Sequence, residues 1–308
     1  MKKIVARILI GSVVVVAVII AFIGGSIVVE GTQGASRLDA IINTRIKNPN
    51  DPEVRAYVAR PKQAGQYPAV IMIHEFWGLN ADIIGKAEAL AQEGYVVVAP
   101  DVFRGSTSGQ VPRAIYQVVS NPPAQVNSDL DAVFGWLSSQ PDVKANKIAI
   151  MGFCFGGGTS LNYSLSNNKL AGTVILYGSP IADATKLKSL SGPVLGIFGG
   201  ADASIPVANV RAFESALKEA GVKNQISIYD NQPHAFVKSV DEIKKDAVQT
   251  KAWNEVLTFL KATLQSNNSL RDVAPTQALN ETNWGYLLIV RVHDIVDTFG
   301  PRHREQSI

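Results

Sequence analysis

Cysteine is almost absent from this chain: Cys154 is the only one among 308 residues. A single cysteine excludes a disulfide within the chain and any metal site built from several cysteines. The net charge of +3 is weak, and no basic cluster alternates with aromatic residues, so nucleic-acid binding has little support. The sequence also lacks internal repeats and low-complexity tracts, and its length fits one large domain or two small ones.

The only cysteine lies in a glycine-rich segment, Gly152-Phe153-Cys154-Phe155-Gly156, that directly follows an apolar run at residues 147–151. Gly-x-Cys-x-Gly after a buried strand has the form of a nucleophile elbow, with cysteine in place of serine. The flanking glycines are needed because a Cβ there would strike the neighbouring strand or the following helix. The helix N-terminus favours a thiolate. The alternative is a buried cysteine that acts as a small hydrophobic residue.

Two further residues follow predicted strands in the order expected for a catalytic triad. Asp202 comes just after the apolar run 194–198, and His234 comes just after the alternating run 225–229. The order nucleophile, acid, histidine is that of α/β-hydrolases, whose catalytic groups gather at the carboxyl edge of the sheet. His234 would accept the thiol proton of Cys154, and Asp202 would fix the tautomer of the imidazole. Taken singly, a helix-capping Asp202 and a surface His234 are the simpler alternatives.

The distribution of apolar residues predicts an α/β fold with a mostly parallel, doubly wound sheet. The first predicted strand could lie antiparallel at an edge. We expect strands at residues 54–59, 69–73, 95–99, 147–151, 172–177, 194–198 and 225–229. We expect helices at residues 82–93, 127–139, 155–165, 206–220 and 241–265.

Several segments together resemble the dienelactone hydrolases, which are carboxymethylenebutenolidase-type enzymes with an α/β-hydrolase fold. The segments are residues 69–80 with His74-Glu75, residues 152–158, Gly200-Ala201-Asp202 and His234-Ala235-Phe236, and the resemblance extends over residues 54–263. It implies that Glu75 contacts the resting thiol, keeps it largely neutral and helps to deprotonate it when substrate binds. It also implies an oxyanion hole formed by the backbone N–H groups of Phe76 and Phe155. Capping of the helix after Asn80 is an alternative role for Glu75.

The arginines with which this family binds a substrate carboxylate are only partly kept. The segment Pro100-Asp101-Val102-Phe103-Arg104 resembles the one that carries the first arginine, so Arg104 inherits that role, with a surface arginine as the alternative. The second arginine lies four residues after the histidine, where this chain has Lys238. Lysine supplies charge but not the bidentate geometry of a guanidinium. The fold and mechanism therefore transfer better than the dienelactone substrate.

The N-terminus carries the features of a membrane anchor. Lys2, Lys3 and Arg7 precede an uncharged run of 22 residues, 8–29, which is long enough to span a hydrocarbon core of about 30 Å. The positive residues predict a single-pass protein with a cytoplasmic N-terminus and the hydrolase outside the cell membrane. A cleaved signal, which would give a secreted or periplasmic enzyme, is the alternative. We expect a linker at 30–50, the hydrolase domain at 51–265 and an extension of unknown role at 266–308.

These observations predict a hydrolase that cleaves a small ester or lactone through a cysteinyl acyl intermediate, without a cofactor or metal. Its partners would be that substrate, which Arg104 would favour when it bears a carboxylate, and the membrane through residues 8–29. The first alternative is a non-catalytic binding or scaffold domain at the membrane that kept the fold. A redox thiol sensor is a weaker alternative, because the chain has no second cysteine to resolve an oxidised Cys154.

Overall fold

A computed structural model of the protein describes residues 21–22, 24–49 and 51–265. Within these residues an eight-stranded sheet has the order β1-β2-β4-β3-β5-β6-β7-β8. The strands from β3 to β8 pair in parallel, whereas β2 pairs antiparallel with both β1 and β4. The strands are β1 (Thr44–Ile46), β2 (Val54–Ala59), β3 (Tyr67–Ile73), β4 (Val96–Pro100), β5 (Val143–Phe153), β6 (Gly172–Leu176), β7 (Val194–Gly199) and β8 (Asn224–Tyr229).

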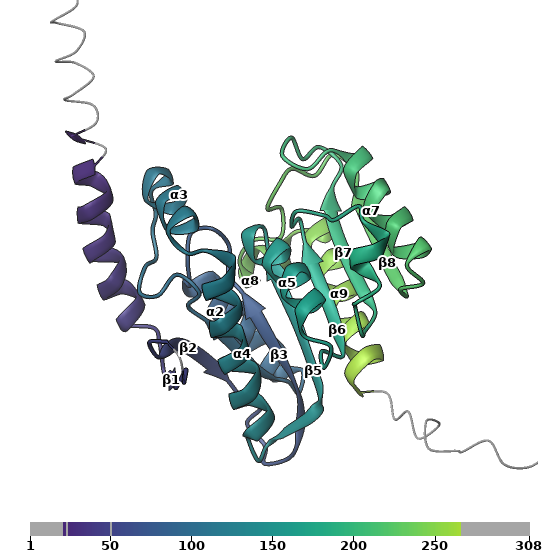
Figure 1. The fold of residues 1–308 in the computed structure, drawn as a ribbon, viewed down its shortest axis with the longest axis horizontal. Helices are drawn as coiled ribbons and strands as arrows, with labels where there is room; N and C mark the ends of the chain where they lie inside the picture. The colour runs from purple at the N-terminus through teal and green to yellow at the C-terminus, as the bar shows by residue number, and fades with distance from the viewer. Residues whose placement is uncertain (1–20, 23, 50, 266–308) are drawn as a thin grey trace, which may run out of the picture. The chain divides into compact units, whose positions relative to one another are not determined.

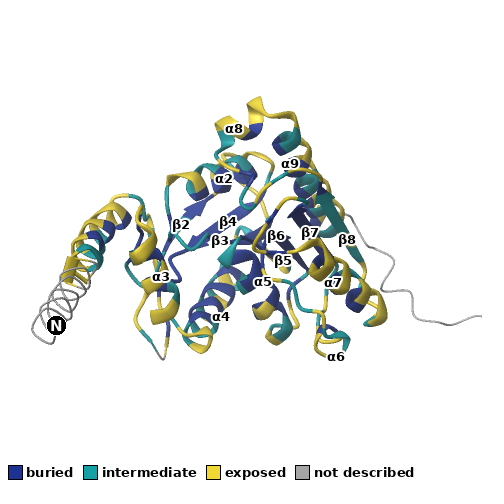
Figure 2. Cartoon of the chain, turned by 90° about the horizontal axis from the view of Figure 1, so that it is seen from above, coloured by how far each residue is buried: buried dark blue, intermediate teal, exposed yellow. Residues whose placement is uncertain are grey.

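Helices cover both faces of this sheet, with α2, α8 and α9 on one face and α4, α5 and α7 on the other (Figures 1 and 2). The helices are α2 (Ala81–Gln92), α3 (Val111–Ser120), α4 (Pro123–Ser139), α5 (Phe155–Ser166), α6 (Ala184–Leu187), α7 (Val207–Glu219), α8 (Val240–Lys245) and α9 (Ala247–Leu260), and a π-helical turn follows at Lys261–Gln265. The predicted α/β architecture and all seven predicted strands are present. The predicted helix over 241–265 is instead divided at Asp246, whose carboxylate accepts hydrogen bonds from the first N–H groups of α9.

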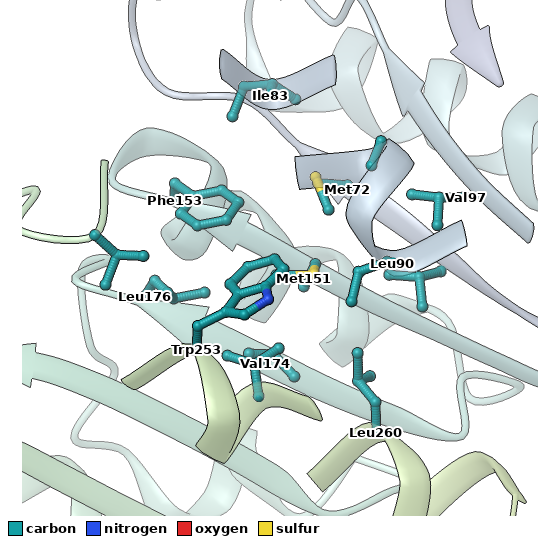
Figure 3. Packing of buried hydrophobic residues seen from close by; sticks show 14 of the residues in the cluster. Met72, Ile83, Leu90, Val97, Met151, Phe153, Val174, Leu176, Trp253 and Leu260 are labelled. Carbon is teal, nitrogen blue, oxygen red and sulfur yellow. The ribbon is translucent and has the colours of Figure 1, made fainter. Parts of the chain in front are cut away.

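The alternation of side chains along the central strands builds a core on each face of the sheet. Val70 and Met72 of β3 pack with α2 and α9, whereas Ile71 and Ile73 of the same strand pack on the side of α4. Figure 3 shows the first of these cores, where Trp253 of α9 lies among residues of α2 and the strands. Because helices cover both faces of the sheet, side chains on both sides of each central strand are buried. The sequences of these strands are therefore continuous apolar runs.

The segment predicted as a linker, in which a short helix was allowed for, contains regular structure among its described residues. Residues 24–39 form a helix whose Leu38 is fully buried in the core, and β1 adds an edge strand that pairs with β2. The strand at 54–59 is therefore antiparallel, as expected, but β1 and not this strand lies at the edge. The β-branched residues Thr44 and Ile46 favour a strand. This strand has only three residues and lies among polar residues, so the sequence pattern did not indicate it.

The predicted anchor at residues 8–29 and the extension at 266–308 lie largely outside the described residues, which include only 21–22 and 24–29 of the anchor. Within the part of the chain that the structure describes, no helix is long and apolar enough to cross a membrane.

Candidate active site

Cys154 lies in the sharp turn between β5 and α5, where the glycines around it leave no room for side chains. Its backbone has φ +54°, a value that is strained for a residue with a Cβ, and its N–H donates to the carbonyl of Leu176 at 2.9 Å. A Cβ on Gly152 would lie 2.1 Å from the carbonyl oxygen of Gly156, and one on Gly156 would lie 2.4 Å from that of Ile73. Close packing of the turn thus explains the two glycines of the motif.

Asp202 and His234 meet across the loops that follow β7 and β8. The Nδ1 atom of His234 lies 2.6 Å from Oδ2 of Asp202. The other oxygen, Oδ1, accepts hydrogen bonds from the backbone N–H groups of Ser204 at 2.7 Å and Ile205 at 3.1 Å. The carboxylate is buried and fixed on both sides, so it can hold the imidazole in one tautomer, with the proton on Nδ1.

Cys154 also influences the imidazole of His234, so its side chain lies in the neighbourhood of the Asp202–His234 pair. The hydrogen bond with the Cys154 side chain is the largest cause that raises the pKa of His234 to about 9, and Asp202 acts in the same direction against the effect of burial. Because Nδ1 is held by Asp202, Nε2 is the ring nitrogen left for the thiol. A proton taken from sulfur would be held well by this imidazole.

Tyr177, which the sequence did not indicate, supports His234 from the side. Its ring lies edge-on to the imidazole with the centroids 5.4 Å apart, and its hydroxyl donates to the carbonyl of Val237 at 3.0 Å. Burial raises the pKa of Tyr177 well above its ordinary value, so the phenol stays neutral and donates. Its only sequence signal is that it is the aromatic last residue of the strand predicted at 172–177.

His74 has a structural role at the ends of β3 and β4. Its Nδ1 lies 2.7 Å from the carbonyl oxygen of Glu75, and its Nε2 accepts the N–H of Val102 at 3.3 Å. Burial lowers the pKa of His74 to about 4, so the ring is neutral and can donate at one nitrogen while it accepts at the other. It thereby ties the loop that carries Glu75 to the loop after β4.

Glu75 lies close enough to the site to interact with the charge of His234, but it is not hydrogen-bonded to the thiol. Burial raises the pKa of Glu75, while the positive charges of Lys86 and His234 lower it. Within the described residues no hydrogen bond joins the Glu75 carboxylate to Cys154, so the predicted resting contact with the thiol is not seen. The carboxylate is instead a half-buried group whose pKa is raised above its ordinary value, mainly by burial.

Lys86 is a second residue that sequence reasoning missed, and it is the buried counterpart of Glu75. It is only 3% exposed, and its ammonium group forms no ion pair with the described residues. The ammonium lies 4.9 Å from the centroid of the Phe153 ring, next to Cys154 in the chain. Burial lowers the pKa of Lys86, and the nearby Glu75 opposes this. A lysine within the apolar stripe of α2 was the available signal.

The two predicted oxyanion-hole groups are available as donors. In the part of the chain described, neither the N–H of Phe76 nor that of Phe155 donates to another residue, and Phe155 is the first residue of α5. The carbonyl of Phe76 accepts a hydrogen bond from Nε2 of Gln117 at 2.8 Å, which holds its peptide from the α3 side. An unpaired N–H at a helix N-terminus is suited to a developing negative charge.

Arg104 and Lys238, the residues predicted to bind a substrate carboxylate, are each paired with a carboxylate of the protein. Arg104 donates from Nε and a terminal nitrogen to the two carboxylate oxygens of buried Asp129, at 3.0 and 2.9 Å, and also lies 3.2 Å from Asp51. These pairs raise the pKa of Arg104 and leave it neutralised within the protein, which is at odds with the predicted role. Lys238 is exposed and lies 3.4 Å from Glu242, one helical turn along the chain. The described residues contain no cluster of side chains suited to hold a metal ion.

Comparison with known proteins agrees with this geometry. The model of the dienelactone hydrolase family matches residues 54–264. The chain belongs to the dienelactone hydrolase family. It is therefore a hydrolase of the dienelactone hydrolase type, and its sheet with helices on both faces is an α/β-hydrolase-like fold.

Curated relatives cover most of the same region. A Salmonella typhimurium protein provisionally named carboxymethylenebutenolidase is 33% identical over 67% of this chain and 82% of its own. A protein of the same provisional name from Methylorubrum extorquens is 31% identical over 66% of this chain and 75% of its own. A crystal structure from Klebsiella pneumoniae, provisionally titled a dienelactone hydrolase, has 30% identity and a TM-score of 0.62, and covers 70% of this chain and 97% of that chain.

Proposed function

We propose that this protein hydrolyses a small carboxylic ester or lactone through a covalent acyl intermediate on Cys154. The observation that carries the proposal is the arrangement around His234, whose imidazole is hydrogen-bonded to Asp202 at Nδ1 and adjoins the Cys154 thiol. A nucleophile, a base and a group that orients the base are the three parts that nucleophilic catalysis needs.

In the first half of the reaction, His234 takes the thiol proton and the sulfur of Cys154 attacks the carbonyl carbon of the substrate. The negative charge that develops on the carbonyl oxygen would be stabilised by the N–H groups of Phe76 and Phe155. The C–O bond of the ester then breaks, and the leaving alcohol oxygen takes the proton from His234. In the second half, water gives a proton to His234 and attacks the thioester, which releases the acid and restores the thiol.

The choice of an ester or lactone over an amide follows from the leaving groups. A thiolate leaves more readily than an amide nitrogen, so a tetrahedral adduct with an amide tends to revert unless the departing nitrogen is protonated. An alkoxide with a proton available from His234 competes better. We propose that Glu75 assists when substrate enters, because burial raises the pKa of its carboxyl and makes it able to accept a proton.

The acyl intermediate can be tested directly by intact-mass spectrometry of the protein mixed with a p-nitrophenyl ester. We expect the mass to rise by one acyl group, and we expect Cys154→Ala to show neither the increase nor turnover. Cys154→Ser serves as the matched control because it keeps a small nucleophile in the same turn. Turnover that persists in Cys154→Ala would refute the cysteine mechanism, and a wild-type protein without acylation or turnover would favour the non-catalytic scaffold.

We also propose that residues 8–29 anchor the protein in the cell membrane, with the hydrolase outside. The run is uncharged over 22 residues, and its described end belongs to a helix on which Phe22, Val28 and Val29 are exposed. We expect the protein to stay in the membrane fraction through a carbonate wash, because the binding is hydrophobic. A mature N-terminus near Ser26 or Ser36 would instead show a cleaved signal and a secreted or periplasmic enzyme.

A further inference from the structure

The helix α3 presents an apolar surface to solvent. Val111, Ile115 and Val119 follow one another at intervals of four residues, so they lie on one side of the helix. Their exposed fractions are 51, 54 and 77%, and Tyr116 beside them is half exposed. We call these four residues the outer face of α3. Figure 2 shows exposed and intermediate residues along most of this helix.

The opposite side of α3 is joined to the candidate active site. Ala114 and Gln117 are buried, and Nε2 of Gln117 donates to the carbonyl of Phe76 at 2.8 Å. Phe76 directly follows Glu75, and its N–H is one of the proposed oxyanion donors. The outer face is thus separated from the site by the thickness of one helix, about 10 Å.

The N-terminal helix (residues 24–39) is attached next to the start of α3. Buried Glu30 accepts hydrogen bonds from the N–H of Gly109 at 2.9 Å and from the hydroxyl of Ser108 at 3.3 Å. Arg37 of the same helix donates to the carbonyl of Thr107 at 3.2 Å. The uncharged run 8–29 is therefore followed at once by Glu30, which is bonded to the loop leading into α3.

The charges around α3 are compatible with lipid headgroups. Residues 102–128 contain no aspartate or glutamate, and their only charged residues are Arg104 and Arg113. Arg104 is neutralised by Asp129, whereas Arg113 stacks on Tyr116 with its guanidinium 5.1 Å from the ring centroid. An apolar helix face with an arginine and a tyrosine beside it is typical of segments that lie at a membrane interface.

We propose that the outer face of α3 rests on the lipid bilayer into which residues 8–29 insert, and that the enzyme acts on esters that partition into this bilayer. The proposal rests on the proposed hydrolase and on its membrane anchor. Four side chains alone would bind lipid weakly, but attachment through residues 8–29 keeps α3 close to the surface. Docking places Phe76, whose peptide is bonded to α3, near the pool of amphiphilic substrate.

The docking can be measured without activity, in the full chain with Cys154→Ala. A single new cysteine is introduced as Val119→Cys, labelled with an environment-sensitive fluorophore and reconstituted in vesicles of phosphatidylcholine and phosphatidylglycerol. We expect the label to shift to the blue and to be quenched by nitroxide-bearing lipids. Lys218→Cys, on exposed α7, is the control and should stay unquenched, and Phe22→Cys reports on the anchor.

Each pattern of quenching decides the question. Quenching at both 119 and 22 supports docking of an anchored protein, whereas quenching at 119 without 22 overturns the anchor on which the proposal rests. Quenching at 22 without 119 keeps the anchor and overturns the docking. If neither is quenched, the anchor and the docking are both overturned. A blue shift at 119 that appears without lipid shows that a second copy or another segment of the chain covers α3, which also overturns the proposal.

A kinetic comparison tests the consequence for substrates. Val119→Asp in the active chain should lower turnover of a long-chain ester in vesicles by about tenfold, the size expected for loss of a weak surface contact. Turnover of a soluble short-chain ester should stay within about twofold, because the site itself is unchanged. Val207→Asp, at an exposed valine of α7, is the matched control. Equal losses on both esters would assign α3 to folding alone, and no loss on either would remove lipid docking from catalysis.

Discussion

Two pairs of a buried carboxylate and a cationic side chain differ in the hydrogen-bonding positions that they leave available. Asp202 and His234 both follow strand ends, whereas Arg104 follows β4 and pairs with Asp129 of helix α4. In the Asp202–His234 pair, one carboxylate oxygen is held by backbone N–H groups and the other by Nδ1, so the pair leaves the second ring nitrogen of His234 unused. In the Asp129–Arg104 pair, both carboxylate oxygens are bound by the guanidinium, which also reaches Asp51.

The difference shows why position and charge alone do not identify a binding residue. Arg104 has the residue type and the strand-end location expected of a carboxylate receptor, but its charge is already balanced inside the protein. His234 keeps one hydrogen-bonding position that only a reacting group satisfies. We therefore expect substitutions in the first pair to change the rate, and substitutions in the second to change the free energy of unfolding.

The largest effect is expected for Asp202→Asn. The amide cannot hold the imidazole in the required tautomer, so kcat/KM should fall by about 10³ to 10⁴ while the fold is kept. Asp183→Asn, at a helix cap away from the site, is the control. A loss of less than tenfold would show that the first pair is structural, like the second.

The same variant should change the pH dependence of stability. The pKa of His234 is raised from 6.5 to about 9 in the folded state, so its contribution to stability is complete below pH 6.5 and is lost as the pH rises to 9. Urea unfolding of the wild type should therefore show falling stability across this window, and Asp202→Asn should show a shallower fall. An identical pH dependence of stability in both proteins would show that Asp202 does not contribute to the raised pKa of His234.

Arg104→Ala should reduce the free energy of unfolding by about 3 kcal/mol, because buried Asp129 would lose its partner. The ratio of kcat/KM for esters with and without a carboxylate should not change. Arg211→Ala, which removes an exposed pair with Glu214, should cost less than about 1 kcal/mol. A selective loss on the carboxylate-bearing ester would restore the substrate-binding role predicted from the sequence.

The smallest effect is expected for Lys86→Met, which sharpens the comparison by testing a cation that has no ion pair among the described residues. Removal of its charge should raise the pKa of Glu75, move the acid limb of the kcat/KM profile to higher pH and lower the rate at neutral pH about tenfold. Stability should be unchanged or higher by about 1 kcal/mol, because methionine fills a similar volume without charge. Lys218→Met is the exposed control, and an unshifted profile would leave Lys86 with packing alone.

Much of the fold could be predicted because the strands of a sheet covered on both faces are continuous apolar runs. The strand at Val54–Ala59 has the predicted bounds, and the others differ by a few residues at their ends. β1 and α3 were missed for different reasons. Three residues give too little periodicity to mark β1, whereas α3 is amphipathic but short and begins with Val111-Pro112, between loops that contain glycine and proline.

The candidate site also contains residues that the sequence could predict and residues that it could not. Cys154, Asp202 and His234 follow strands of one parallel sheet, and the carboxyl ends of such strands meet at one edge, so their proximity follows from order along the chain. The partners of Arg104 lie before β2 and on α4, and no local pattern indicates which carboxylates a long side chain will reach. Lys86 and Tyr177 act through burial, which depends on the assembled core.

The edge strand β1 also has a mechanical consequence. A flexible linker of 20 residues would have a root-mean-square end-to-end distance of about 25 Å and would let the enzyme rotate freely at its end. No flexible tether of this kind lies between residues 24 and 46. The N-terminal helix is bonded to the loop before α3, and β1 pairs with β2. A pull on the N-terminal side of this helix would load its bonds to the loop before α3 first and the β1–β2 pairing next, so the force would pass into the body of the enzyme without a flexible segment between.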